Sequence, residues 1–278
     1  MWIPTLYFVE GIPYFLVNNV SVLMFAKMGV PNGQMALFTS LLYLPWTLKF
    51  LWSPFVDIIK TKRWWIITMQ IIMSIAFVVQ ALTMPHPSAE SIAAGSTPMS
   101  LFSFTLILFV FAAFASATHD IAADGFYMLA QSQSSQAAFV GVRSTFYRLA
   151  NVFGNGVIVA VAGLLETRTG NIPLAWQLTI GGSGILLTGL TLYHTFAIPK
   201  PESDVPNIQE DSGNKVAEIF AGFGRTVTTY FKKPGVWLAI IFMLCYRLPE
   251  AFLIKMCTPF LVAAREAGSR CRRHSARS

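Results

Sequence analysis

Apolar stretches of about 20 residues, separated by short polar intervals, constrain this chain more than any other feature of its sequence. A helix of that length crosses the ~30 Å hydrocarbon core of a lipid bilayer. Seven stretches qualify, at approximately residues 3–26, 35–56, 64–84, 101–124, 138–165, 177–197 and 236–262. The sequence therefore predicts an all-α, polytopic helical membrane protein.

The composition is typical of a chain that is embedded in lipid. Of the 278 residues, 54% are hydrophobic and only 12% are charged, whereas about a quarter of a soluble protein is charged. A soluble core cannot bury so much apolar surface. The composition therefore argues against a soluble enzyme, a secreted module and a disordered protein.

Net charge and the rarer residue types exclude further classes. The formal charge is +7, but five arginines and one glutamate in residues 263–278 supply +4 of it. No basic patch interleaved with aromatic residues is left, so we expect no nucleic-acid partner. Three cysteines and four histidines show no ligand spacing, so we expect no metal site, and no motif indicates a cofactor.

The placement of lysine and arginine predicts the orientation, because cytoplasmic loops retain positive charge. With the N-terminus in the cytoplasm, two of these residues, Lys27 and Arg168, fall in outer loops and eight in inner loops. The inner eight are Lys60, Lys62, Arg63, Lys200, Lys215, Arg225, Lys232 and Lys233. We therefore expect a cytoplasmic N-terminus and an external loop at residues 85–100.

One long polar interval divides the chain. Residues 198–235 begin with PKPESDVPNIQEDSGN, which is typical of a linker, and continue with the apolar spacing of an amphipathic surface helix. We expect a six-helix transporter half at residues 1–197, followed by this cytoplasmic linker. A seventh transmembrane helix at 236–262 and an aberrant basic tail at 263–278 complete the expected organisation.

Ionisable residues inside the apolar stretches are the strongest functional signal. Each costs at least ~2.5–3.5 kcal/mol in hydrocarbon unless it has a partner, a cavity or a position near the interface. They are Glu10, Lys49, His119, Asp120, Asp124, Arg143, Arg148, Arg247 and Glu250.

Two acidic and two basic residues of this set are expected to face each other. Asp120 and Asp124 are four apart on one helix face, and Arg143 and Arg148 begin the next helix after a short turn. Two interpretations stay open, an ionic lock between helices or a site where one carboxylate couples transport to protons. Glu10 joins the proton-coupling candidates, because glycine and proline loosen its helix in the way of helices that line cavities.

Five further residues are candidates for a substrate cavity. Lys49 either extends to the membrane surface or contacts an anion. Tyr43 and Trp46 either pack against neighbouring helices or stack on a sugar. Arg247 and Glu250 repeat, in the seventh stretch, the charged and proline-containing character of the first one.

Several segments, taken in order, resemble one transporter family. They are YFVEGIPY, LYLPWTLKFLWSPFVD, SATHDIAADGFYM and GVRSTFYRLAN. The loop within WSPFVDIIKTKRWW is similar to the charged gating loop of the major facilitator superfamily, with Asp57, Lys60, Lys62 and Arg63 as its charged residues. Ser53 replaces the glycine of that motif. Over residues 2–268 the chain resembles the AmpG-type muropeptide permeases, a branch related to the acetyl-CoA transporters.

The resemblance implies a twelve-helix carrier of the bacterial inner membrane that imports anhydromuropeptides with protons for cell-wall recycling. It also implies that Asp120, Asp124, Arg143 and Arg148 match the charged segment of the fourth and fifth helices, and that Glu10 matches the first. The resemblance ends after residue 268. We therefore expect a truncated or frameshifted reading frame whose product does not transport by itself.

Three alternatives stay open beside this interpretation. Basic and aromatic cavity residues also suit a carrier of acyl-CoA or another amphiphilic anion. A non-transporting membrane interaction or sensor protein would need a soluble input or output domain, and the linker is too short and polar to be one. A membrane-embedded enzyme using Asp120 and Asp124 would need a nucleophile or metal set beside them, and the sequence shows none, so we expect no enzyme.

Overall fold

The computed structural model describes residues 2–205, together with 222, 224, 225, 228, 229, 231–239, 241, 242 and 245. The chain divides into two compact units, Met1–Asp211 and Ser212–Ser278. The described part of the first unit is built from helices and contains no strand.

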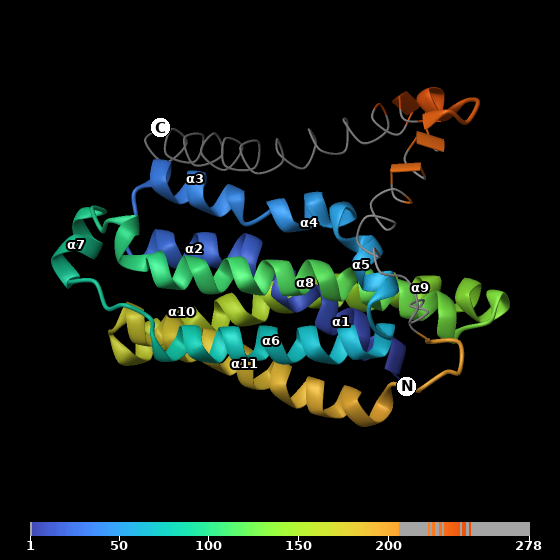
Figure 1. Ribbon diagram of the computed structural model, residues 1–278. Coiled ribbons are helices and arrows are strands. Elements are labelled where there is room, and N and C mark those ends of the chain that lie inside the picture. Colours follow the sequence, from blue (N-terminus) through green and yellow to red (C-terminus); the bar gives the residue numbers. More distant parts are fainter. Residues whose placement is uncertain are drawn as a thin grey trace, which may run out of the picture. The chain divides into compact units, whose positions relative to one another are not determined.

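Six helical segments follow one another in residues 2–205, and several of them are interrupted (Figure 1). They are segment 1, α1–η1–α2 (Trp2–Phe15, Leu16–Val20, Ser21–Lys27); segment 2, α3–α4–η2–α5 (Asn32–Leu41, Leu44–Leu48, Lys49–Leu51, Ser53–Ile58); segment 3, α6 (Lys62–Leu82); segment 4, η3–α8 (Met99–Phe102, Ser103–Ala130); segment 5, α9–η4–α10 (Gln133–Val152, Phe153–Ile158, Val159–Thr169); and segment 6, α11 (Ile172–Ala197). A short helix, α7 (Ala89–Ala94), lies in the connection between segments 3 and 4.

The length and apolarity of these helices confirm the predicted fold class. Four helices of the described residues are long and apolar enough to cross a membrane: Trp2–Lys27, Lys62–Leu82, Met99–Ala130 and Gln133–Thr169. Segment 6 contains the expected stretch 177–197 within one helix of 26 residues, which is ~39 Å long. The chain is an all-α polytopic membrane protein. Most of the expected helix at 236–262 lies outside the described residues.

The prediction of one continuous helix at 35–56 is wrong. Segment 2 is broken into short helices, with turns at Leu42–Tyr43 and around Trp52. Pro45 and Pro54 each lie in the first turn of a new helix, where a missing N–H costs nothing, whereas inside a continuous helix each would remove a hydrogen bond. The breaks place Lys49 in the 3-10 turn η2.

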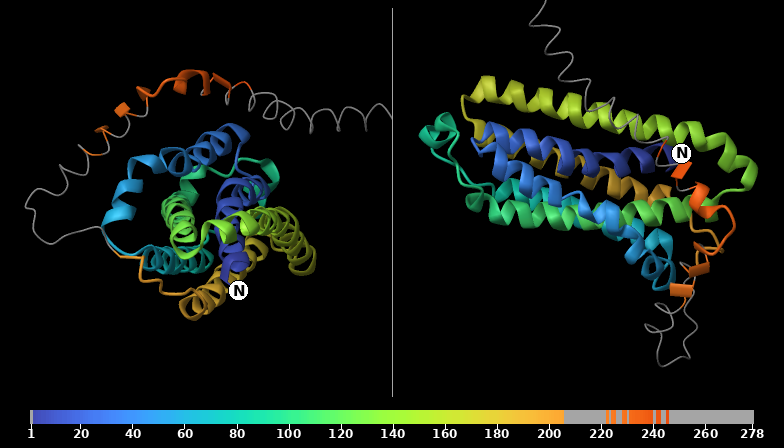
Figure 2. Two further views of the ribbon diagram at one scale, coloured as in Figure 1. Left: turned by 90° about the vertical axis from the view of Figure 1, so that its right-hand side faces the viewer. Right: turned by 90° about the horizontal axis from the view of Figure 1, so that it is seen from above.

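Packing between the segments defines the bundle. Segment 3 packs along segments 4 and 6, and segment 1 packs along segment 5 and against segment 4, as the end-on view shows (Figure 2). Buried apolar side chains such as Phe25, Phe77, Phe109 and Trp176 fill the space between them. Segment 1 therefore lies between segments 4 and 5 and contacts both of them.

Glycine allows segments 1 and 5 to approach closely. A Cβ atom on Gly11 would lie 2.6 Å from the Cβ of Ala150, and one on Gly154 would lie 2.9 Å from the Cβ of Phe15. Any larger side chain would separate the two backbones. This close contact sets the two π-helical turns, η1 and η4, beside each other.

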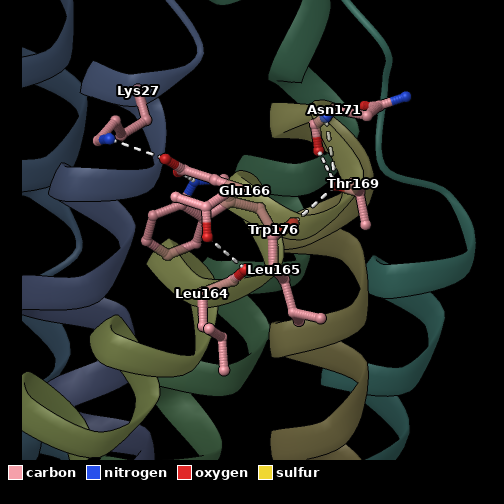
Figure 3. Close-up of polar contacts among 8 residues, drawn as sticks. Lys27, Leu164, Leu165, Glu166, Thr169, Asn171 and Trp176 are labelled. Carbon is pink, nitrogen blue, oxygen red and sulfur yellow. Dashed lines mark hydrogen bonds and ion pairs between the residues drawn. The ribbon is translucent and has the colours of Figure 1, made fainter.

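A cluster of polar contacts around Glu166 joins segments 1, 5 and 6 at one end of the bundle, and Figure 3 shows these contacts. The Oε2 atom of Glu166 lies 2.8 Å from the Nζ of Lys27, and its Oε1 accepts a hydrogen bond of 2.9 Å from the indole N–H of Trp176. Asn171 caps segment 6 by accepting from the backbone N–H of Leu174. The cluster fixes the relative positions of three helix ends.

At the opposite end, the chain after segment 6 returns to the start of segment 3. The carboxylate of Asp204 accepts hydrogen bonds from the backbone N–H groups of Lys62 at 2.7 Å and Arg63 at 3.0 Å. The hydroxyl of Thr61 accepts from the N–H of Trp64. The first residues of the expected linker are therefore held against the bundle, and residues 206–221 lie outside the described ones.

Candidate functional site

Charged side chains of segments 1, 2, 4 and 5 meet on one face of the bundle. Asp124 forms an ion pair with Arg143 of α9 and accepts a hydrogen bond of 3.1 Å from the hydroxyl of Tyr7 in α1. Asp120, one turn earlier on α8, forms an ion pair with Lys49 of η2. Each of the two aspartates therefore has its own cation, and the two cations come from different segments.

The guanidinium group of Arg143 is held between two aromatic rings. Its central carbon lies 4.3 Å from the centroid of the Tyr7 ring and 4.5 Å from that of Tyr127. Because the negative faces of aromatic rings attract a cation, this position fixes Arg143 while Asp124 balances its charge. Arg143 is thus an anchored residue of the bundle rather than a freely rotating cation.

Glu10 differs from the two aspartates because it has no ion pair among the described residues. Its side chain is buried, and its Oε2 atom has no hydrogen-bond partner. The carboxyl group lies close enough to Asp120, Asp124 and Arg143 for electrostatic interaction with all three. A third carboxyl group thus stands beside two ion pairs.

A cleft of about 480 Å³ opens over this cluster, within the range of about 300–1,000 Å³ that is usual for ligand sites. Its walls are Tyr7, Glu10, Val140, Arg143, Ser144, Tyr147 and Arg148. Arg148 is exposed and forms no ion pair with the described residues. The cleft therefore combines a buried carboxyl group, an anchored cation and a cation that is available to a ligand.

The aromatic candidates gather around Tyr14 of segment 1, near this cleft. Ring centroids lie 5.1 Å from it for Trp46, 6.4 Å for Tyr43 and 6.5 Å for Tyr147, one of the cleft's own residues. Tyr43 and Trp46 therefore pack against segment 1, while Tyr43 keeps half of its surface exposed. The packing leaves the Tyr43 ring available to a second planar group.

The candidate gating loop forms a separate cluster at the end where Asp204 lies. Lys62 forms an ion pair with Asp57, and its buried side chain passes beside Gly125, where an added Cβ atom would lie 3.0 Å from the lysine Cε. Arg63 donates to backbone carbonyl groups of residues 195 and 198. Lys60 is exposed and has no ion pair with the described residues.

A buried series of side-chain hydrogen bonds, which sequence reasoning missed, links four segments. Gln70 of segment 3 lies 2.9 Å from the Nε2 of His119 and 3.0 Å from the Nδ1 of His194, whose Nε2 lies 3.0 Å from the hydroxyl of Thr5. The available signal is that these side chains are polar within otherwise apolar stretches. His119 faces this series of hydrogen bonds, on a different side of α8 from the ion pair of Asp120.

Two of the substrate-cavity candidates, Arg247 and Glu250, lie outside the described residues. Within the described residues, no group of three or more histidine, cysteine, aspartate or glutamate side chains is placed to hold a metal ion.

A family model described as acetyl-coenzyme A transporter 1 matches residues 2–153, which is more than half of the chain. The chain belongs to the acetyl-coenzyme A transporter family. The part matched by the family model contains all the charged residues of the cluster, namely Glu10, Lys49, Asp120, Asp124, Arg143 and Arg148.

Relatives of the chain include proteins named as a permease and as a transporter. The anhydromuropeptide permease of Escherichia coli strain K12 is 25% identical over 265 residues, covering 92% of this chain and 47% of the relative. The Rickettsia felis protein named "Putative transporter AmpG 4" is 23% identical over 264 residues, covering 91% and 57%. An uncharacterized protein of Schizosaccharomyces pombe is 30% identical over 152 residues, covering 51% and 28%.

These matches confirm the resemblance to AmpG-type permeases that the sequence motifs predicted. The chain spans about half the length of the curated relatives it matches. It is an integral membrane protein of a transporter family, and the charged cluster with its cleft is the candidate site.

Proposed function

We propose that the chain carries the N-terminal bundle of a secondary active permease of the major facilitator type, which imports anhydromuropeptides together with protons. In this proposal the membrane is the bacterial inner membrane, the N-terminus is cytoplasmic and cell-wall recycling is the process served. The name of the Escherichia coli relative, aligned over 92% of this chain, supports the substrate class. The permease and transporter names of the relatives argue against the sensor and enzyme alternatives.

The observation that carries the proposal is the state of the three carboxyl groups. Asp120 and Asp124 are each neutralised by a cation, whereas Glu10 is buried at the cleft without one. Of the three, Glu10 can therefore take up and release a proton without breaking an ion pair. Its position on the cleft wall would let a bound substrate change its surroundings, which is what coupling requires.

Acetyl-coenzyme A is the second candidate substrate, because the matching family model carries its name. Coenzyme A bears several negative charges on its phosphates. The described cleft offers one cation without a carboxylate partner, Arg148, so it would neutralise only a small part of that charge. An anhydromuropeptide, an N-acetylated amino sugar that carries a short peptide, presents mainly amides and hydroxyls. The charge balance of the cleft favours it.

Binding to the purified chain in lipid nanodiscs tests this choice. We expect radiolabelled anhydromuropeptide to bind saturably and to be displaced by unlabelled anhydromuropeptide but not by acetyl-coenzyme A. If acetyl-coenzyme A displaces the radiolabel and unlabelled anhydromuropeptide does not, acetyl-coenzyme A becomes the preferred substrate.

The role of Glu10 is tested by the pH dependence of binding. If substrate binds together with a proton, the affinity falls as the pH rises from mildly acidic to mildly alkaline. Glu10→Gln should bind substrate with an affinity that no longer changes with pH, because the amide mimics the protonated acid. Asp57→Asn, which alters an exposed carboxylate of the gating loop, is the matched control and should keep the dependence. An unchanged pH dependence in Glu10→Gln would exclude Glu10 as the coupling group.

A further inference from the structure

Three asparagine side chains form a hydrogen-bonded chain between segments 1 and 5. The Nδ2 of Asn19 donates to the Oδ1 of Asn155 at 3.0 Å, and the Nδ2 of Asn155 donates to the Oδ1 of Asn151 at 2.7 Å. Among the described residues, the Oδ1 of Asn19 and the Nδ2 of Asn151 enter no hydrogen bond. This series of three asparagines therefore has a free acceptor at Asn19 and a free donor at Asn151.

The three asparagines extend the polar wall of the cleft along segment 5. Ser144, Arg148, Asn151 and Asn155 are spaced by three or four residues, so they share one helix face, and all of them are exposed. Ser144 and Arg148 already line the cleft. A polar strip thus leads from the charged cluster to the two π-helical turns.

This strip lies within helices that are long and apolar enough to cross a membrane. Asn19 belongs to Trp2–Lys27, and Asn151 stands at the middle of Gln133–Thr169. An arginine and several amides at this depth are too costly to leave in lipid, so the face must line water or protein. The π-helical turns that carry Asn19 and Asn155 are a conformation found mainly at functional sites.

The chemistry of the strip matches one kind of ligand group. A free amide acceptor and a free amide donor complement the N–H and C=O groups of an N-acyl or peptide amide. Arg148, one turn from Asn151, presents a planar cation that suits a carboxylate. We propose that Asn19, Asn151, Asn155 and Arg148, the amide strip, form a binding subsite for the amide and carboxylate groups of the transported molecule. This inference rests on the proposed function and adds a subsite to it.

The test compares variants of the strip in the nanodisc binding assay with radiolabelled anhydromuropeptide. Asn151→Ala removes the free donor, and Asn155→Ala removes the side chain that positions Asn19 and Asn151, so each should weaken binding about threefold to tenfold. Arg148→Gln should weaken it about tenfold or more, and should have no effect on an analogue whose carboxylates are converted to carboxamides.

Asn18→Ala is the matched control. Asn18 lies in the same π-helical turn as Asn19, but its amide donates to the backbone carbonyl of Tyr14 within its own segment. The control should bind like the unaltered chain. Asn151→Ser and Asn155→Asp keep a polar group and serve in place of any alanine variant whose thermal unfolding midpoint falls.

The outcomes separate the subsite from the proposed function. If the unaltered chain binds anhydromuropeptide while folded strip variants bind with unchanged affinity, the amide strip is not a subsite and the proposed function stands. If the unaltered chain does not bind anhydromuropeptide, the proposed function fails and the inference fails with it. An equal loss in Asn18→Ala would show that the effect comes from the helix turn, which also overturns the inference.

Discussion

The carboxylate of Asp124 accepts hydrogen bonds from two residues on two different helices. Its contribution to the free energy of unfolding can therefore be measured by changing each partner. Its Oδ1 atom receives both the guanidinium of Arg143 and the hydroxyl of Tyr7. The pair is only partly shielded, since 45% of the Asp124 side chain and 28% of the Arg143 side chain are exposed. Its contribution to stability should therefore lie between those of surface and buried ion pairs.

Asp124→Asn should lower the free energy of unfolding by about 1–2 kcal/mol, and Tyr7→Phe by about 0.5–1.5 kcal/mol. Because both changes act on the same oxygen atom, the double variant should lose less than the sum of the two. Denaturant titration in detergent, followed by tryptophan fluorescence, measures these differences. Strictly additive losses would show that the two contacts are independent.

Sequence reasoning at this scale predicted which charges matter but not all of their partners. The four-residue spacing of the aspartates and the short turn before the arginines indicated facing groups, and Asp124 does lie against Arg143. Asp120 is paired with Lys49 instead. That choice depends on the break in segment 2, a tertiary feature that helix periodicity does not contain. The contacts of Gln70 with the rings of His119 and His194 could not be predicted either, because they depend on how segments 3, 4 and 6 pack together.

At the scale of elements, close contact between segments 1 and 5 depends on the absence of a side chain at one position. Gly11→Ala would place a Cβ atom 2.6 Å from that of Ala150, so we expect a loss of about 1–3 kcal/mol in the free energy of unfolding. Gly163→Ala is the control, because nothing lies within 4 Å of its added Cβ atom. The control should be neutral or stabilising by up to about 1 kcal/mol, since alanine favours the helix. Equal effects of the two changes would contradict the packing argument.

The cap that Asp204 provides for segment 3 leads to a second prediction about elements. Asp204→Ala leaves the N–H groups of Lys62 and Arg63 without their acceptor, so the free energy of unfolding should fall by about 1 kcal/mol. The chain after segment 6 should also detach from the bundle. Faster amide hydrogen exchange at residues 198–205 measures this. Glu202→Ala is the control, because Glu202 forms no ion pair with the described residues; equal exchange in both variants would show that Asp204 does not hold the segment.

Elements differ in how far the sequence predicts them. Segments 1, 3, 4, 5 and 6 follow from long apolar stretches, because lipid leaves a helix as the only way to satisfy the backbone. The break of segment 2 was foreseeable from Pro45 and Pro54, whose effect an average over 20 residues conceals. The π-helical turns were not predicted; they lie where segments 1 and 5 contact each other, which the length of an apolar stretch does not indicate.

For the molecule as a whole, we expect residues 1–278 to bind the ligand without transporting it. Alternating access in this class moves one bundle against another around a central site, and the described segments form one bundle that carries the cleft. We expect residues 1–278, reconstituted alone in vesicles with an inward proton gradient, to bind anhydromuropeptide without accumulating it. Vesicles without protein and binding in nanodiscs are the controls. Accumulation above the empty vesicles would mean that copies of this chain supply the second bundle to one another.

The organisation of the whole chain into a six-helix half, a linker, a seventh helix and a basic tail stays a prediction. Apolar stretch lengths support the first part, where the described helices lie. After residue 205, the apolar stretch at 236–262 supports the seventh helix, whereas the linker and the basic tail are predicted from composition alone.

The paired π-helical turns also determine where this chain tolerates a change of length. A ring closed by a bond from residue i to i+5 contains one more residue than an α-helical ring, so η1 and η4 each store one extra residue. Deleting a residue elsewhere in a helix would rotate everything beyond it by about 100°, and would move Lys27 away from Glu166. Deleting one within Leu16–Val20 would instead restore a regular helix, with Glu10 and Lys27 still on their present faces. The two turns are therefore the points where segments 1 and 5 can each lose a residue while the charged groups at both ends keep their alignment.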